Sequence, residues 1–122
     1  MGRVPKYRAW YKPKGVMIQP ENLVMINFDT KVLGVYMEMD GKGYHVLRMS
    51  DFELMEYTGL KDKNDQEIYE GYILLWEHKG LSVKVKVRFK DGMFLAGDMP
   101  LYDCLDEEII GNIYENPELI EE

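Results

Sequence analysis

The chain has 122 residues, a formal net charge of −7 at pH 7 and a hydrophobic content of 46%. This length is typical of one domain, residues 1–122, which can form a core without disulfides. The acidic balance disfavours bulk, non-specific binding to nucleic acid, because such binding requires a positive field. The single cysteine, Cys104, excludes an internal disulfide and fits a reducing, cytosolic setting. No apolar run approaches the ~20 residues that span a bilayer, so no membrane partner is expected.

The N-terminal half contains short apolar and aromatic segments separated by turn-forming residues, a pattern typical of β-strands. We expect strands at residues 6–11, 16–18, 23–28, 32–39 and 44–48. The sequence Asp40-Gly41-Lys42-Gly43 predicts a hairpin between the last two of them.

A short helix is predicted before the middle of the chain. Ser50 and Glu53 have the spacing of a capping box, in which each side chain bonds to the backbone N–H of the other residue. Gly59 is expected to end the element. A helix of this length is marginal alone, so packing must stabilise it.

In the central segment, residues 62–65 predict a turn, because Asn and Asp tolerate left-handed backbone conformations. Ile68 and Tyr69 begin the next strand. Gly71 interrupts it and indicates a bulge or a close approach of two backbones. Residues 72–77 are expected to form a core strand.

The clearest periodicity in the chain covers residues 82–90, where apolar and basic residues alternate. A period of two predicts a half-buried antiparallel strand. Asp91-Gly92 predicts a type I′ turn, and residues 93–96 form the returning strand. Residues 109–113 are expected to form a last strand, and Asn116 followed by Pro117 predicts a helical turn near the C-terminus.

These elements predict an α+β fold that is mostly β. We expect a small, strongly bent or barrel-like antiparallel sheet, similar to an SH3-like barrel, with one or two short helices.

Three segments carry a resemblance to a known family. They are KYRAW at residues 6–10, YTGLKDKN at 57–64 with EIYEG at 67–71, and IGNIYENPEL at 110–119. In these segments the chain resembles the YopX family of phage and prophage proteins. The resemblance implies a fold built mainly of strands, a protein of a bacterial host or its phage that acts in the cytoplasm, and no established biochemical activity. The family usually has Asp after the Glu-Gly pair, whereas this chain has Tyr72, which puts a polar role at that position in doubt.

No recognisable catalytic constellation is present, so we expect the protein not to be an enzyme and to need no cofactor. The residues most suited to nucleophilic or metal chemistry are His45, His78 and Cys104, and no motif links them. Structural histidines are the simpler interpretation, and no metal site is predicted. Acid pairs such as Glu107 and Glu108 are interpreted as solvated surface.

A basic strand face is the basis of one functional hypothesis. It is formed by the polar side of residues 82–90, with two residues of the first strand as further candidates: Lys84, Lys86, Arg88, Lys90, Arg8 and Trp10. Cations and aromatics on a small β-domain can bind single-stranded nucleic acid. The simpler alternative is a solvent-exposed strand face whose lysines prevent edge-to-edge aggregation.

Protein–protein contact is the hypothesis that we favour. Tyrosine and methionine are enriched at interfaces, and the chain has nine of each. The candidate surface comprises four residues of the central segment: Tyr57, Tyr69, Glu70 and Tyr72. The alternative is that most of these side chains form the core. We expect a non-enzymatic binding or accessory module whose partner is a second copy of the chain or an unidentified host or phage protein.

Overall fold

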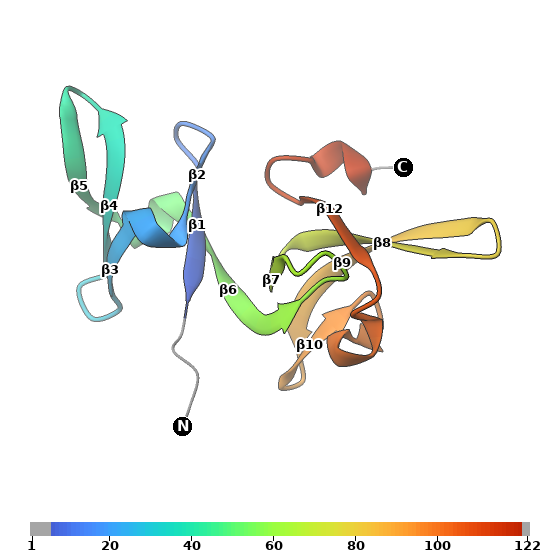
Figure 1. The fold of residues 1–122 in the computed structure, drawn as a ribbon. Coiled ribbons are helices and arrows are strands. Elements are labelled where there is room, and N and C mark those ends of the chain that lie inside the picture. Colours follow the sequence, from blue (N-terminus) through green and yellow to red (C-terminus); the bar gives the residue numbers. More distant parts are fainter. Residues whose placement is uncertain (1–5, 121–122) are drawn as a thin grey trace. The chain divides into compact units, whose positions relative to one another are not determined.

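A computed structural model describes residues 6–120, and it is built almost entirely of strands (Figure 1). Within this range there are twelve strands and four short 3-10 turns, and no α-helix. The chain divides into two compact units, an N-terminal unit of residues 6–56 and a C-terminal unit of residues 57–120. The mostly β fold that the sequence predicts is therefore confirmed. No helix in the described part of the chain is long and apolar enough to cross a membrane.

The N-terminal unit combines two sets of antiparallel strands around a small core. Its strands are β1 (Tyr7–Tyr11), β2 (Val16–Ile18), β3 (Leu23–Asn27), β4 (Val32–Met39), β5 (Lys42–Arg48) and the first half of β6 (Phe52–Lys61). Strand β1 pairs with β2 and with β6, whereas β3, β4 and β5 form a three-stranded sheet in that order. The core residues are Ala9, Tyr11, Ile18, Leu33, Val35 and Phe52. The rings of Tyr11 and Phe52 pack with their centroids 4.9 Å apart across the β1–β6 pair.

The predicted helix beginning at Ser50 is wrong. Only one 3-10 turn, Met49–Asp51, is present, and strand β6 begins at Phe52. Residues 52–56 pair with the whole of β1, which buries the Phe52 and Met55 side chains. The capping-box pattern is a local preference, and it is outweighed by strand pairing with residues about 40 positions earlier in the chain.

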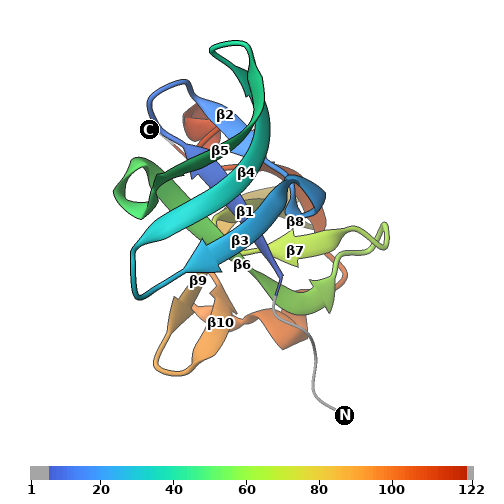
Figure 2. The same ribbon diagram turned by 90° about the vertical axis from the view of Figure 1, so that its left-hand side faces the viewer.

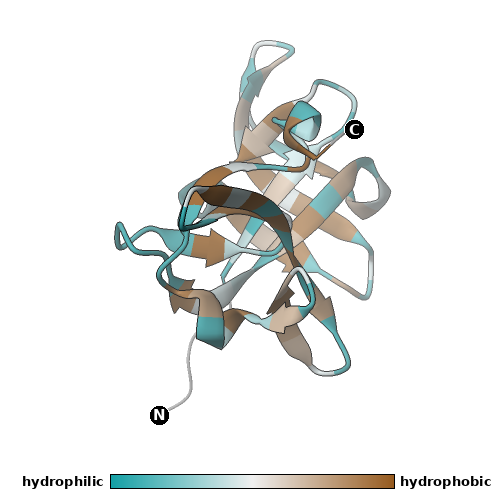
Figure 3. Ribbon diagram, turned by 90° about the vertical axis from the view of Figure 1, so that its right-hand side faces the viewer, coloured by the Kyte–Doolittle hydropathy of each residue, from teal (hydrophilic) through white to brown (hydrophobic). Residues whose placement is uncertain are grey.

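The C-terminal unit is dominated by a five-stranded antiparallel sheet in the order β11-β10-β9-β8-β12. The five strands of this sheet are β8 (Tyr72–His78), β9 (Leu81–Lys90), β10 (Met93–Ala96), β11 (Met99–Pro100) and β12 (Glu108–Asn112). The unit also contains β7 (Glu67–Tyr69), which pairs with the second half of β6. Strand β9 curves along its length, so the sheet is strongly bent, as predicted (Figure 1). Hydrophobic residues concentrate on the strands of this unit and hydrophilic residues at its turns (Figure 3). The predicted strands are confirmed in both units to within about two residues at each end.

Three hairpins are closed by two-residue turns whose residues both have positive φ angles. They are Asp40-Gly41, Lys79-Gly80 and Asp91-Gly92, with φ between 50° and 82°. Two positive φ angles define a type I′ turn, whose twist matches that of the flanking strands. The predictions at Asp40-Gly41 and Asp91-Gly92 are confirmed. The turn at Lys79-Gly80, which lies at the tip of the β8–β9 ribbon, was not predicted, because lysine is not a typical residue for this position.

Gly71 brings three backbone segments together, as the interrupted strand pattern indicates. Its φ angle is 87°, which strongly favours glycine. Its N–H donates to the carbonyl oxygen of Val87 at 2.8 Å, and its own carbonyl oxygen accepts from the N–H of Ile113 at 2.9 Å. The turn between β7 and β8 is thus tied both to β9 and to the segment after β12.

The buried side chain of Asp62 joins two distant parts of the C-terminal unit. Its Oδ1 atom accepts hydrogen bonds from the backbone N–H groups of Asn64 and Gln66, both at 2.9 Å. Its Oδ2 atom accepts a third, from the N–H of Ile109 in β12, also at 2.9 Å. A carboxylate can be buried when its oxygens accept such bonds. Asp62 therefore closes the turn that the sequence predicts and also fixes β12 beside it.

The segment after β12 is organised by a second buried polar residue, Asn112. Its Oδ1 atom accepts from the N–H groups of Tyr114 at 3.0 Å and Glu115 at 2.8 Å. The predicted C-terminal turn is confirmed as a 3-10 turn at Pro117–Leu119. Asn116 precedes it, but its side chain accepts from the N–H of Asn112 at 3.2 Å instead of capping the turn.

Replacing Asp62 with alanine should lower the free energy of unfolding by about 3 kcal/mol, because three backbone N–H groups lose a buried, charged acceptor. Urea unfolding followed by circular dichroism measures this change. Asp29→Ala, which removes an exposed acid from the N-terminal unit, is the control and should change stability by no more than about 0.5 kcal/mol. A loss below about 1 kcal/mol for Asp62→Ala would contradict its role as a tie between the turn and β12.

Candidate functional site

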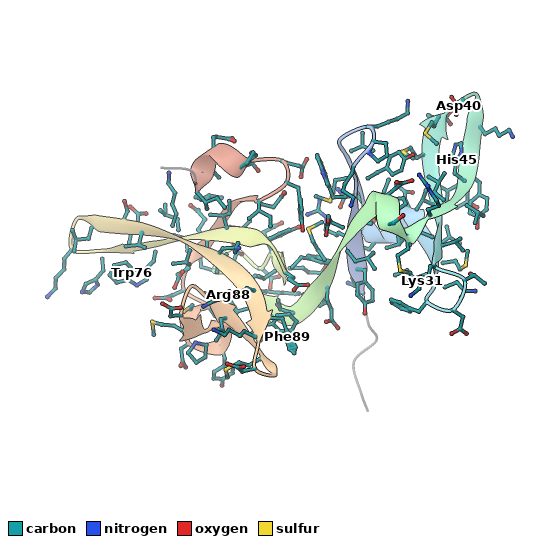
Figure 4. The ribbon with its side chains drawn as sticks, turned by 180° about the vertical axis from the view of Figure 1, so that it is seen from behind. Lys31, Asp40, His45, Trp76, Arg88 and Phe89 are labelled. Carbon is teal, nitrogen blue, oxygen red and sulfur yellow. The ribbon has the colours of Figure 1, made fainter. Side chains whose placement is uncertain are left out.

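The predicted basic face lies on β9, and its four cations differ in how they are held. Lys84, Lys86 and Lys90 are exposed. Arg88 is half-buried, and its guanidinium pairs with Asp98 at 2.7 Å and donates to the carbonyl oxygen of Gly97 at 3.1 Å (Figure 4). Arg88 therefore stabilises the turn after β10, and the three lysines are the cations that a partner could reach.

Two further candidates for the basic face lie elsewhere in the chain. Arg8 and Trp10 are half-buried residues of β1, which belongs to the N-terminal unit. They pair in register with Met55 and Glu53 of β6. They were assigned to the same predicted face as β9 only because they are a cation and an aromatic residue.

Most of the predicted interaction surface contributes to packing in the C-terminal unit. Tyr69 is 3% exposed, and Tyr72 is also buried. The Tyr69 ring lies between those of Tyr57, at 5.4 Å, and Tyr72, at 5.6 Å. Glu70 and Tyr57 are half-buried. Tyr72 begins β8 and completes this row of rings, so the position where the family usually has Asp is here occupied by a packed aromatic residue.

The histidines and the cysteine occupy separate settings. The ring of His45 in β5 makes a hydrogen bond with the carbonyl oxygen of Lys42 at 2.9 Å. His78 in β8 lies beside Trp76, with ring centroids 5.6 Å apart. Cys104 is buried in a 3-10 turn at Leu101–Cys104. Among residues 6–120, no group of three or more His, Cys, Asp or Glu side chains could hold a metal ion.

The three-stranded sheet β3-β4-β5 of the N-terminal unit (Figure 2) carries an exposed aromatic face that was not identified from the sequence. Tyr36 is 53% exposed, Tyr44 42% and Val46 55%. Tyr36 and Tyr44 are paired across β4 and β5 with ring centroids 5.3 Å apart, and Val46 is paired with Gly34. The Tyr44 ring lies against Gly34, where a Cβ atom would collide with its hydroxyl. The signal in the sequence was the spacing of Tyr44 and Val46, which lie two residues apart in a predicted strand and therefore share one face.

A groove with a volume of about 370 Å³ opens within the C-terminal unit. Its apolar lining comes from β8, β9, β10 and β11: Trp76, Val83, Val85, Ala96 and Met99. Figure 4 labels Trp76 on β8. Its acidic lining comes from the segments after β10 and around the Leu101–Cys104 turn: Asp98, Asp103, Asp106 and Glu107. Cys104 completes the lining, which contains no basic side chain.

Glu107 has the most perturbed carboxyl group in this groove. Only 5% of the residue is exposed, and its Oε1 atom has no hydrogen-bond partner in the described chain. Burial raises the pKa of this carboxyl above its ordinary value of 4.5. A hydrogen bond with Cys104 lowers the pKa by a smaller amount, and the charge of Asp106 raises it. Burial likewise raises the pKa of the Cys104 thiol to about 12, with Glu107 adding to the effect, so the thiol is protonated at neutral pH.

The interpretation of Glu107 and Glu108 as a solvated pair is therefore wrong for Glu107. Glu108 is half-buried and accepts from the side-chain amide of Asn64 at 3.3 Å. Glu107 lies in the bend that precedes β12 and lines the groove, whereas Glu108 is the first residue of β12 and does not.

The sequence profile described as YopX protein matches residues 6–121. The chain belongs to the YopX family. Its fold is similar to the crystal structure of protein EF1440 from Enterococcus faecalis, with a TM-score of 0.70 and 26% identity over 98% of this chain and 100% of that one. Comparison with curated proteins gives no significant match.

In this YopX protein the residues of the resembling segments mainly hold the fold. Besides Asp62, Gly71 and Asn112, the buried side chain of Thr58 donates to the carbonyl oxygen of Ile68 at 2.8 Å. These contacts are internal to the C-terminal unit. Two surfaces that are open to partners, the aromatic face and the groove, consist of residues outside these segments.

Replacing Glu107 with glutamine should stabilise the protein at neutral pH. Folding raises the pKa of this carboxyl, so the native state loses stability as the pH rises from the pKa in the unfolded chain, 4.5, through the higher pKa in the folded chain. Glutamine has no charge to bury, so the melting temperature of Glu107→Gln should exceed that of the wild type at pH 7.5 and approach it below pH 4.5. Thermal melts across this pH range measure the difference, and a variant equally destabilised at every pH would contradict the burial of a charge at this position.

Proposed function

We propose that this YopX protein is a non-enzymatic binding module that acts in the bacterial cytoplasm through protein–protein contacts. The aromatic face of the β3-β4-β5 sheet is the contact surface. The observation that carries the proposal is the exposure of Tyr36, Tyr44 and Val46 side by side on one face. Large side chains exposed in a contiguous patch typically mark an interaction site in a soluble protein.

The packing of Tyr44 against Gly34 and Tyr36 supports a defined contact surface. Gly34 has no side chain to separate the Tyr44 ring from the sheet, so the ring lies close to the backbone. The rings of Tyr36 and Tyr44 already pack on each other, which lowers the entropy lost when a partner immobilises them. Two further exposed apolar side chains of this unit, Val24 and Phe28, line a hollow of about 300 Å³ at β3. The outer surface of this unit is thus apolar over more than one strand.

The edge of the same sheet offers a second kind of contact. Strand β5 pairs with β4 on one side, and within residues 6–120 no strand pairs with its other side. The free N–H and C=O groups of such an edge can accept a strand from a partner. A second copy of the chain can contribute the same edge in a two-fold symmetric dimer. The expected partners are therefore a second copy of this chain or another protein of the host or phage.

The Tyr36→Ser/Tyr44→Ser double variant should weaken partner binding by at least about tenfold, because buried interface tyrosines commonly contribute more than about 1 kcal/mol each. Pull-down from bacterial lysate with quantification of captured proteins measures binding to other proteins. Light scattering measures self-association, for which a monomer gives 14.4 kDa.

Tyr102→Ser is the matched control, since Tyr102 is 75% exposed but lies in the C-terminal unit. Thermal melting establishes that each variant is folded. The proposal fails if the folded double variant binds and self-associates like the wild type, or if the wild type is monomeric and captures no protein.

Binding of single-stranded nucleic acid is a second candidate, favoured by the exposure of Lys84, Lys86 and Lys90 along β9. Alternate residues of a strand project about 6.6 Å apart, close to the spacing of phosphates in an extended strand. The net charge of −7 and the pairing of Arg88 with Asp98 weigh against strong binding.

If the three lysines contact phosphates, the affinity for a fluorescent single-stranded oligonucleotide should fall with salt with a log–log slope of about −2. Fluorescence anisotropy across a salt series measures the slope. Lys84→Gln/Lys86→Gln should reduce it, whereas Lys42→Gln, in the N-terminal unit, should leave it unchanged. Absence of binding at the lowest salt would exclude this function.

A further inference from the structure

We propose that the groove between β8, β9 and the Leu101–Cys104 turn binds an organic cation, an ammonium or guanidinium group carried on an apolar stem. This site is separate from the aromatic face and does not depend on the protein–protein function proposed above. Its volume of about 370 Å³ lies within the range of ~300–1,000 Å³ typical of small-ligand sites.

The shape and lining of the groove fit a ligand with two different ends. Trp76, Val83, Val85 and Met99 provide an apolar wall for a hydrocarbon stem. The lining also includes Asp98, Asp103, Asp106 and Glu107, which a cation at the end of the stem could meet. The indole of Trp76 adds a π-face, to which a cation is attracted.

Glu107 is the residue that points to a ligand. Its carboxyl is almost completely removed from water, and its Oε1 atom lacks a hydrogen-bond donor in the described chain. A buried acceptor without a donor costs free energy, and the weak thiol donor of Cys104, which also donates to the carbonyl oxygen of Pro100 at 3.5 Å, compensates little of that cost. An N–H group of a bound cation would supply both the missing hydrogen bond and the missing charge.

An organic cation suits this arrangement better than a metal ion. Nowhere in residues 6–120 do three acidic, histidine or cysteine side chains converge as metal ligands. Asp103, Asp106 and Glu107 instead all line the groove, which can therefore contact an elongated cation at more than one point. The groove contains no lysine or arginine that would neutralise them, although Asp98 pairs with Arg88 at its rim.

The test is a titration of the full chain with n-hexylammonium chloride, followed by the backbone amide signals in heteronuclear NMR spectra. We expect shifts that map to β8, β9 and the Leu101–Cys104 turn, and an affinity that falls about tenfold or more in Glu107→Gln. Glu108→Gln is the matched control, because it removes the same charge from the adjacent residue, which does not line the groove. The neutral probe 1-hexanol separates charge recognition from simple filling of an apolar groove.

A second titration, with the peptide acetyl-Gly-Lys-Gly-amide, identifies the source of the cation. Binding of both probes would indicate that the groove accepts a lysine side chain of a partner, and binding of n-hexylammonium alone would indicate a free amine; either result supports the proposal. It is overturned if n-hexylammonium does not bind, if 1-hexanol binds equally well, or if Glu107→Gln binds like the wild type. Since Glu107→Gln is expected to be at least as stable as the wild type at neutral pH, loss of binding in a variant with an intact spectrum cannot come from unfolding.

Discussion

The C-terminal unit depends on the buried carboxylate of Asp62. With two oxygens it satisfies three backbone N–H groups, two in its own turn and one in β12, which lies about 47 residues later in the chain. The backbone adds a parallel link, because the N–H of Lys63 donates to the carbonyl oxygen of Glu107 at 3.2 Å. Since Glu107 immediately precedes β12, the interaction that positions the edge strand of the sheet also positions the acidic wall of the groove.

Other residues of the family segments act in the same way. Thr58 joins β6 to β7, Gly71 joins the β7–β8 turn to β9, and Asn112 organises the chain after β12. Each of these residues makes a hydrogen bond that helps to hold separate segments of the chain together. A small β-fold needs such bonds, because the backbone groups of a strand find their partners in other segments. The residues of the family segments that make these bonds therefore stabilise the fold. The surfaces proposed to bind partners are formed by other residues.

Two such surfaces stand out, and their physical characters differ. The face around Tyr36 and Tyr44 exposes aromatic side chains on a sheet, which suits a partner that presents a surface of its own. The groove beside Trp76 is concave and has both apolar and acidic lining residues, which suits a side chain or a small molecule. They belong to different compact units, so each can be altered by mutation without changing the side chains of the other.

The sequence alone predicted most strands and two of the three tight turns, because a period of two and the preference of Asp-Gly for positive φ angles are local properties. It predicted the role of Gly71 for the same reason. It could not predict that Phe52 begins a strand, since pairing with β1 outweighs the local helix signal. Nor could it show that Tyr69 and Tyr72 are buried or that Glu107 lies in a groove, because burial depends on which segments pack together. Long-range packing thus gives two neighbouring acids different settings: Glu108 is half-buried and bonded to Asn64, and the desolvated carboxyl of Glu107 lines the candidate site.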